Sequence, residues 1–344
     1  MALVDLFSDT KSRPTPEMRR AMAEAEVGDE QDFEDPTVNR LQGRVAELLG
    51  KDASLYLPSG TMCNQIAFAI HCRPGDEVLC DRTSHPVNAE AGGPAVNARA
   101  MIRTLAGERG IFSAEQVREG IRAPRRHAPV SRLLSVENTT NYGGGAVWPL
   151  AQVGEVTEVA REHGLATHMD GARLMNAVVA SGTAARDYAE PFDSVWIDFS
   201  KGLGAPVGAV LAGSEAFIEE AWEWKQRLGG AMRQAGVIAA ACVHALEHHV
   251  ERLAEDHEHA RILAEGLASL PGVRLDPKHV ETNIVIFEVP DAAGFAERML
   301  AEREVRFSTL GPAIVRAVTH LDVDREGIER AIEAAATVLG APTT

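Results

Sequence analysis

Lysine is scarce in this sequence, and one lysine stands in a setting that could support covalent chemistry. Only five of the 34 basic residues are lysines, so arginine supplies nearly all of the positive charge. Lys201 follows the apolar run SVWIDFS and precedes the glycine-rich run GLGAPVGAVLAG, whereas the other four lysines have polar neighbours. A lysine in an enclosed site can lose its proton and condense with an aldehyde, which arginine cannot do. Lys201 is therefore a candidate nucleophile, although a lysine at a strand end can also simply reach solvent.

Three other places in the sequence carry groups suited to anion binding or acid–base work. Ser59, Gly60 and Thr61 stand where a strand should end and a helix begin, so their free amides could bind phosphate or form an ordinary helix cap. Asp170 ends the predicted strand ATHMD, where a carboxylate can face a ligand or just form a turn. Arg316 lies in the apolar run IVRAVTH, so its charge requires a buried ion pair or a ligand anion. A guanidinium suits a carboxylate ligand, such as that of an α-amino acid.

The elements that would position these groups alternate between helix and strand over about the first 240 residues. The run 35–50 predicts a helix with Asp35 as its cap and Pro36 at its first position. Further helices are predicted at 59–72, from about 86, and at 150–164, and strands at 54–58, 76–81, 131–138, 166–170, 194–199 and 208–213. This alternation is typical of an α/β fold with a mostly parallel central sheet that helices flank on both faces.

The pattern changes after a long helical stretch at 237–270. Strands are predicted at 273–277, 282–289 and 313–321, and helices at 292–303 and 324–339. We therefore expect residues 1–250 to form an N-terminal segment plus a large domain, and residues 251–344 to form a smaller α+β domain.

Composition excludes several classes of partner. The formal net charge of -16 and the pI of about 5.2 argue against binding to nucleic acid or to anionic membranes. The first residues do not read as a signal peptide, and no run reaches the roughly 18 apolar residues of a membrane span, so we expect a cytoplasmic protein. The four cysteines form no CxxC pair and have no histidines at zinc-ligand spacing, and the histidines at 244–259 lie in an acidic helical stretch. Free thiols and no metal site are expected.

Several motifs, in a shared order and spacing, resemble the threonine aldolase family of pyridoxal-phosphate enzymes. The likeness covers nearly the whole chain, and it implies fold type I of the pyridoxal-phosphate-dependent transferases. The motifs are SDT at 8–10, EDPTVNRLQ at 34–42, LPSGTMCNQ at 57–65, EAGGPA at 90–95, RLLSVENTTN at 132–141, HMDGARLMNAVVASG at 168–182, SKGLGAPVGAVLAG at 200–213, GGAMRQAG at 229–236 and IVRAVTHLDV at 314–323.

The resemblance implies that pyridoxal 5'-phosphate is bound as a Schiff base to Lys201. It places Gly60 and Thr61 at the cofactor phosphate, with Ser200 nearby and Arg233 contributed by a neighbouring subunit. The protein is then expected to be a homo-oligomer, a dimer or a tetramer, with sites shared between subunits.

The resemblance also implies which residues contact the cofactor ring and the substrate. Asp170 would pair with the pyridine nitrogen, whose positive charge a carboxylate stabilises. Arg173 would contact the phenolic oxygen and lie near the substrate carboxylate, which Arg316 and Ser8 would bind. His85 would stack over the ring.

The implied activity is cleavage of L-threonine, L-allo-threonine and related L-β-hydroxy-α-amino acids to glycine and an aldehyde. Either His85 or His127, which matches a family histidine near the substrate hydroxyl, could remove the hydroxyl proton. A β-eliminating lyase or an aminotransferase of the same fold remains open. A nucleotide-binding oxidoreductase is disfavoured because the glycines at 202, 204 and 208 do not fit GxGxxG, and no basic patch supports a non-catalytic regulator.

Two positions depart from the family pattern. Asp32 and Phe33 stand where many relatives have Tyr-Gly, and Gln226 occupies the position of a phosphate-binding lysine, with Lys225 one place away. These changes bear on the cofactor contacts between subunits and on the width of the substrate pocket.

Overall fold

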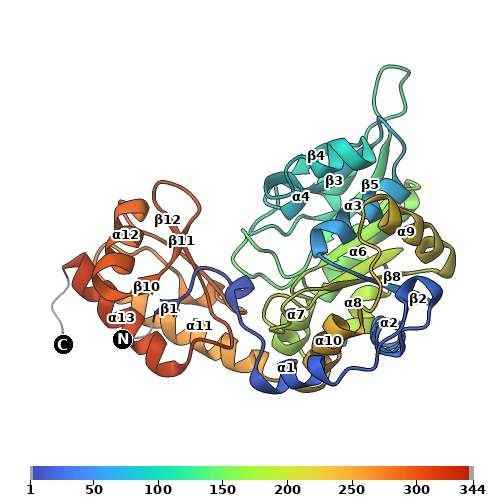
Figure 1. Cartoon of the computed structure of the whole chain (residues 1–344). Helices are drawn as coiled ribbons and strands as arrows, with labels where there is room; N and C mark the ends of the chain where they lie inside the picture. Colours follow the sequence, from blue (N-terminus) through green and yellow to red (C-terminus); the bar gives the residue numbers. More distant parts are fainter. Residues whose placement is uncertain (1–2, 341–344) are drawn as a thin grey trace.

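A seven-stranded sheet is the centre of the fold in the computed structural model, which describes residues 3–340 (Figure 1). The strand order is β2-β8-β7-β6-β5-β3-β4, and β8 alone runs antiparallel to its neighbours. The predicted α/β fold with a mostly parallel sheet is therefore confirmed. The strands are β2 (Ala53–Leu57), β3 (Glu77–Asp81), β4 (Met101–Leu105), β5 (Ser131–Glu137), β6 (Ala166–Gly171), β7 (Ser194–Asp198) and β8 (Ala209–Gly213).

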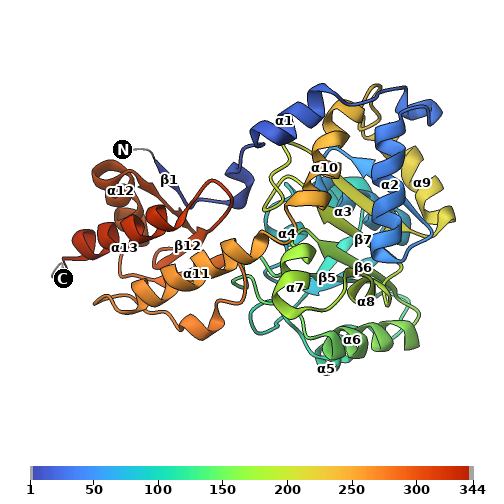
Figure 2. The same cartoon turned by 90° about the horizontal axis from the view of Figure 1, so that it is seen from below.

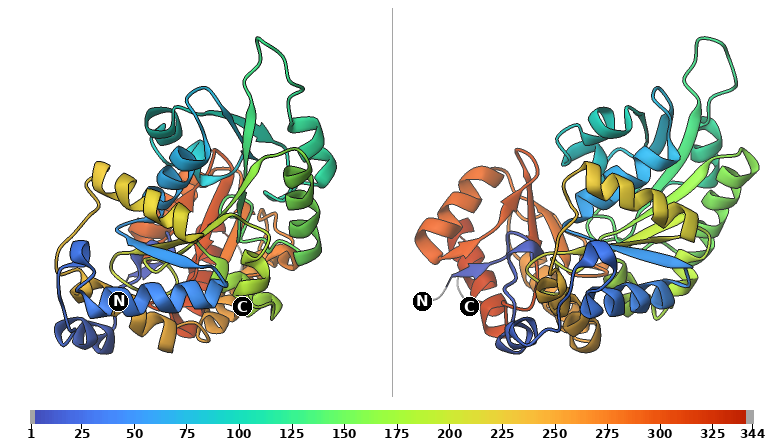
Figure 3. Two further views of the ribbon diagram at one scale, coloured as in Figure 1. Left: turned by 90° about the vertical axis from the view of Figure 1, so that its right-hand side faces the viewer. Right: turned by 45° about the vertical axis from the view of Figure 1, so that its right-hand side comes forward.

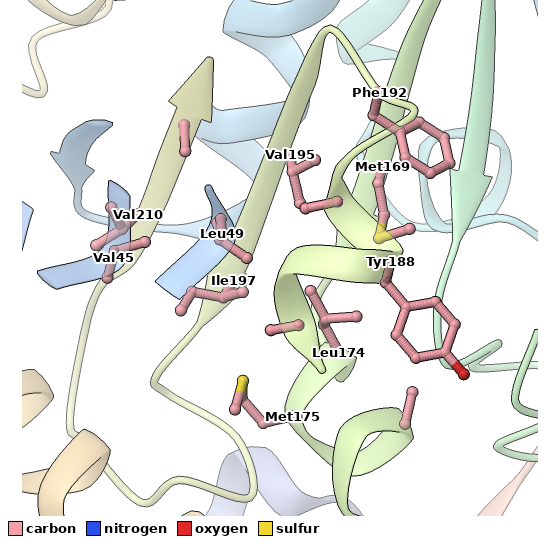
Figure 4. Packing of buried hydrophobic residues seen from close by; sticks show 14 of the residues in the cluster. Val45, Leu49, Met169, Leu174, Met175, Tyr188, Phe192, Val195, Ile197 and Val210 are labelled. Carbon is pink, nitrogen blue, oxygen red and sulfur yellow. The ribbon is translucent and has the colours of Figure 1, made fainter. Parts of the chain in front are cut away.

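Helices cover both faces of this sheet, because alternate residues of each strand point to opposite sides. In β7, Val195 and Ile197 join one core and Trp196 joins the other. Figure 4 shows part of the first core, where Val195 and Ile197 lie with Leu49 of α2 (Pro36–Leu49). Residues of α3 (Gly60–His71) and α9 (Glu215–Arg227) belong to the second core. Figure 3 shows the helices on the two sides of the sheet. The remaining helices of this part are α1 (Pro16–Ala23), α4 (His85–Asn88), α5 (Ala114–Gly120), α6 (Leu150–Glu162), α7 (Leu174–Ser181), α8 (Ala185–Ala189) and α10 (Gly236–His248).

Local capping explains why α2 begins and ends where the sequence predicts. The Asp35 carboxylate accepts hydrogen bonds from the backbone N–H groups of Thr37 and Val38, and Pro36 occupies the first turn. Gly50 ends the helix with φ 62°, a conformation that glycine adopts without steric cost.

The C-terminal part has its own core and a three-stranded antiparallel sheet, ordered β11-β12-β9. Its elements are α11 (Leu253–Ala268), β9 (Ile284–Glu288), α12 (Ala292–Arg303), β10 (Val305–Arg306), β11 (Ser308–Thr309), β12 (Ile314–Val318) and α13 (Arg325–Leu339). Strand β1 (Val4–Asp5) pairs in parallel with β10, so the N-terminal segment packs on this part of the molecule (Figures 1 and 2). The N-terminal segment thereby passes between the two parts, beside the site described below.

Three predicted elements differ from the structure. Residues 273–277 form no strand: Arg274 makes only an isolated bridge with Glu288, and Pro277, which has no N–H to donate, opens a 3-10 helix. The stretch 237–270 is two helices, α10 and α11. The helix predicted from about 86 is the single turn α4, followed after Gly92 and Gly93 by a π-helical turn at Pro94–Ala98. No helix in residues 3–340 is long and apolar enough to cross a membrane.

Candidate active site

One cavity of about 330 Å³ gathers most of the predicted site residues. It lies where β5, β6 and β7 end at their carboxyl ends, which is where ligands bind in open α/β sheets. Residues of β12 and of the N-terminal segment complete its wall. Of the residues predicted from the sequence, its lining includes Ser8, Gly60, Thr61, His85, Asp170, Arg173, Ser200, Lys201 and Arg316.

Lys201 projects into this cavity from the turn that follows β7. Its Nζ lies 2.7 Å from Oδ2 of Asp198, and its side chain is 16% exposed. The Ser12 hydroxyl donates to the backbone oxygen of Lys201, which ties the N-terminal segment to this turn. Asp198 is the carboxylate within reach of the proton that Lys201 must lose to become a nucleophile. The sequence reasoning missed Asp198, although it lies three residues before the lysine.

A pair of buried carboxyl groups lies beneath the cavity, because Glu137 of β5 and Asp170 of β6 stand opposite each other in the sheet. Burial raises the pKa of Asp170, against the lowering effects of Lys201 and His85. Burial and the neighbouring Asp170 raise the pKa of Glu137 to about 7, although the backbone N–H groups of Asn141 and His85 each donate to it at 2.7 Å. The site thus holds one carboxyl group that titrates near neutral pH.

His85 begins α4 and shares a hydrogen bond with a third buried acid, Glu90. Its Nδ1 lies 2.9 Å from Oε1 of Glu90. Burial alone would lower the pKa of His85, but the hydrogen bond to Glu90 and the charge of Asp170 raise it above its ordinary value. His85 therefore holds a proton more readily than an ordinary histidine does, as suits a group that must take one from a substrate.

Arg316 is buried in β12 and faces the cavity with neutral partners only. Its Nη1 donates to Oδ1 of Asn141 at 2.7 Å, and its Nε donates to the Ser308 hydroxyl at 3.2 Å. Among the residues that the structure describes it makes no ion pair, and burial lowers its pKa. Of the two alternatives for this arginine, an anionic ligand fits this environment better than a structural ion pair.

Arg173, in contrast, is already paired. Its Nε and Nη2 each donate at 2.7 Å to the carboxylate of Asp9, and both side chains are buried. Burial raises the pKa of Asp9, but Arg173 and the amide of Asn283 outweigh it and hold that pKa well below its usual range. Asp9 thus fixes Arg173 at the cavity wall and leaves Nη1 for a ligand.

The first turn of α3 gives the cavity a set of backbone donors. Ser59 caps the helix by accepting from the N–H of Met62, and Gly60 and Thr61 line the cavity. A Cβ built on Gly60 would lie 2.1 Å from the Trp196 ring, so only glycine lets this turn approach the indole so closely. The turn can hold an anion such as phosphate.

Two predicted site residues do not line this cavity. His127 is exposed on the loop 121–130, which stands away from the body of the molecule between α5 and β5 (Figures 1 and 3). Arg233 is exposed after α9, and its Nη1 lies 2.7 Å from Oδ2 of Asp29. Lys225 also lies elsewhere, because its buried Nζ pairs with the buried Glu30 at 2.9 Å.

Three lining residues that the sequence does not single out, Glu137, Thr139 and Asn141, stand in the motif VENTTN. Asp9, which pairs with Arg173, stands in the motif SDT. Within the described part of the chain, no group of three or more His, Cys, Asp or Glu side chains could hold a metal ion. The four cysteines are free and buried.

Comparison with known proteins identifies the family. Residues 5–290 match the family model described as beta-eliminating lyase. The chain is 43% identical over 296 residues to the probable low-specificity L-threonine aldolase 2 of Arabidopsis thaliana, covering 85% of this chain and 83% of that relative. It is 41% identical over 327 residues to the low specificity L-threonine aldolase of Escherichia coli K12, covering 94% and 96%.

Solved structures agree on the fold. A threonine aldolase of Leishmania major superposes with a TM-score of 0.85 at 20% identity, covering 98% of this chain and 99% of the other. A structure of SPT with PLP superposes with a TM-score of 0.75 at 19% identity, covering 99% and 89%. The fold is therefore that of the type I pyridoxal-phosphate enzymes, and by sequence this chain belongs to the beta-eliminating lyase family and to the low-specificity L-threonine aldolases.

Proposed function

We propose that this protein is a pyridoxal-phosphate-dependent lyase that cleaves L-threonine, L-allo-threonine and related L-β-hydroxy-α-amino acids to glycine and an aldehyde. The observation that carries the proposal is that one cavity combines the amine of Lys201, the buried carboxylate of Asp170 and the guanidinium of Arg316. The family membership supports the same activity.

The residues around the cavity fit pyridoxal 5'-phosphate. The first turn of α3, with Gly60 and Thr61, would hold the phosphate together with Ser200, and Lys201 would hold the aldehyde carbon through Nζ. The hydroxyl oxygen of Thr139, at the cavity wall, is buried and finds no hydrogen-bond partner among residues 3–340, as expected where a ligand supplies one. When bound, this cofactor supplies an electron sink for the bonds at Cα of an amino acid.

His85 and Asp170 would hold the ring of the cofactor. Asp170 would face the ring nitrogen, where burial of the carboxylate strengthens its interaction with a positive charge. The free Nη1 of Arg173 is available for the phenolic oxygen or for the substrate carboxylate.

The substrate carboxylate would bind Arg316, with Ser8 beside it. A bidentate contact fixes the plane of the carboxylate, and this sets which bond at Cα aligns with the ring. Cleavage of Cα–Cβ requires a base at the β-hydroxyl. In this chain's own cavity that base is His85, whereas His127 could reach a site only in another subunit.

The proposal extends to assembly and location. We place Arg233 and His127 at the cavity of a neighbouring subunit of a homo-oligomer, dimer or tetramer, because both are exposed and lie outside their own cavity. Four unpaired, buried cysteines support action in the reducing cytoplasm.

An assay of purified, cofactor-loaded protein with threonine, allo-threonine, phenylserine and serine tests the activity. We expect equimolar glycine and aldehyde from the β-hydroxy amino acids with L configuration at Cα. Release of ammonia with a keto acid, in place of glycine, would instead identify an eliminating lyase and contradict the proposal. Transfer of the amino group to an added keto acid would identify an aminotransferase.

A further inference from the structure

A continuous line of buried hydrogen bonds leads away from Asp170 to the far end of helix α3. Asn64 Nδ2 lies 2.9 Å from Oδ2 of Asp170, and Asn64 Oδ1 lies 3.1 Å from Nε2 of His168. The Nδ1 of His168 lies 2.8 Å from the Ser194 hydroxyl, which lies 2.8 Å from Nε2 of His71. Neither the proposed chemistry nor the predicted site uses these four residues.

The fold explains how the line is built. Asn64 and His71 stand seven residues apart in α3, which is two helical turns, so both face the sheet. His168 and Ser194 stand opposite each other on β6 and β7, directly beneath that helix face. Asn64, His168 and Ser194 are each 0% exposed, so water cannot substitute for any of their partners.

One group that can only donate sets the directions of the hydrogen bonds made by Asn64. The Trp196 indole N–H donates to Asn64 Oδ1 at 2.7 Å, which identifies that atom as the oxygen. The same oxygen must then accept from Nε2 of His168, so this nitrogen carries the hydrogen. The amide nitrogen of Asn64 is left to donate to Asp170, and also to Glu90 at 2.7 Å.

The remaining links are fixed in turn. Burial lowers the pKa of His168 well below its ordinary value, so the ring is neutral and its Nδ1 accepts from the Ser194 hydroxyl. That hydroxyl has one hydrogen, so its oxygen accepts from Nε2 of His71. Burial also lowers the pKa of His71, to about 4, against the charge of Asp193, and its ring stacks on Phe217. All of these bonds therefore point toward Asp170.

We propose that His71, Ser194, His168 and Asn64 form a one-directional hydrogen-bond array that holds the Asp170 carboxylate ionised and in place for the ring nitrogen it would face. Each donor in such a line polarises the next, which strengthens the bond that reaches the carboxylate. An amide cannot pass a proton along, so the array positions and stabilises Asp170 without relaying protons. The four are positioning residues, and their role toward the cofactor depends on the proposed function.

Neutron diffraction from crystals of the cofactor-loaded protein tests the array directly. We expect deuterium on Nε2 and none on Nδ1 of both His168 and His71. Deuterium on Nδ1 of His168 would overturn the proposal, whether or not the protein cleaves threonine, so failure of the array and failure of the proposed function are distinguishable.

Cofactor affinity gives a second, independent measurement. Ser194→Ala removes the middle link and should raise the dissociation constant of pyridoxal 5'-phosphate roughly 2- to 12-fold, the effect of one lost hydrogen bond. Ser54→Ala is the matched control, because this buried serine donates one hydrogen bond, to the Gln42 carbonyl at 2.7 Å, outside the array. Equal cofactor affinity in the two variants would contradict the proposal.

A pair of substitutions at His168 separates the array from mere packing. A glutamine can donate to Asn64 and accept from Ser194, whereas a leucine can do neither. His168→Gln should therefore bind the cofactor more tightly than His168→Leu. If the leucine variant folds and binds the cofactor as tightly as the glutamine variant, His168 only fills space.

Discussion

Arg316 is a buried charge whose protein partners are all neutral oxygen atoms, and this makes its substitution informative. Arg316→Lys keeps the charge but loses the two-pronged contact that sets the carboxylate plane. We expect kcat and kcat/KM for threonine to fall together, by about 100-fold, because the Cα–Cβ bond loses its alignment. Cofactor affinity and melting temperature should change little. A destabilised but fully active variant would show that Arg316 has a structural role.

Glu137 should make stability depend on pH. Its folded pKa of about 7 lies above the ordinary value of 4.5 for a glutamate, so the folded protein binds the extra proton between these values. The contribution of this carboxyl group to the free energy of unfolding is therefore lost as the pH rises from about 4.5 through 7.

Melting temperatures of cofactor-free wild type and Glu137→Gln at pH 5 and pH 8 measure this effect. From pH 5 to pH 8, the melting temperature of the wild type should fall more, or rise less, than that of the variant. The buried histidines His71 and His168 act in the opposite direction, but equally in both proteins, so their effect cancels in the comparison. The difference then reports Glu137 together with Asp170 and His85, whose charges interact with it. An identical pH response in the two proteins would contradict the assignment.

At the scale of elements, the close contact between Gly60 of α3 and Trp196 of β7 should make stability and cofactor binding sensitive to any added side chain at residue 60. Gly60→Ala places a methyl group against the buried Trp196 and should cost about 1–3 kcal/mol of stability and weaken cofactor binding. Gly43→Ala is the control, since nothing lies within 4 Å of its added Cβ in the exposed middle of α2. That variant should gain roughly 0.5–1 kcal/mol. Thermal melts and cofactor titrations of both variants measure these effects. A Gly60→Ala protein with wild-type stability and cofactor affinity would contradict the prediction.

Most strands and helices could be predicted because their local signals agree with their burial. The Asp35-Pro36 cap and the final Gly50 define α2, and apolar runs define β3, β5 and β7. Strand β4 was missed because it lies at the sheet edge and is largely solvent-exposed, with little apolar pattern. Residues 273–277 looked like a strand because an apolar pattern does not reveal that Pro277 and the cap at Asp276 start a 3-10 helix.

From the residues alone, the site could be predicted only where a residue has a local signature, whereas Ser8, His85 and Arg173 follow from the family resemblance. Lys201 and Asp170 stand at strand ends that the sequence reveals. The pairing of Asp9 with Arg173, 164 residues apart, depends on how the N-terminal segment crosses the molecule. Glu137 and Asp170 are neighbours because β5 and β6 are adjacent in the sheet, and no local sequence pattern encodes this strand order.

At the scale of the whole molecule, sites shared between subunits can be tested by mixing two inactive proteins. Lys201→Ala and Arg233→Ala should each have little activity. If Arg233 serves the neighbouring subunit, a mixed dimer carries one intact site, and random exchange should restore about a quarter of wild-type activity. If subunit exchange is verified and activity does not recover, the sites are not shared between subunits. Full activity of a protein that light scattering shows to be a monomer would also contradict shared sites.

The most direct test of the central claim is to load the purified protein with pyridoxal 5'-phosphate, reduce it with borohydride and map the modified peptide by mass spectrometry. We predict a single cofactor adduct on Lys201, loss of threonine cleavage after reduction, and no adduct or coloured complex in Lys201→Ala. Lys51→Ala, which changes a lysine bonded to the Phe192 carbonyl far from the cavity residues, serves as the control and should label like wild type. A reducible adduct that persists in Lys201→Ala, or one on another lysine of an active protein, would contradict the account.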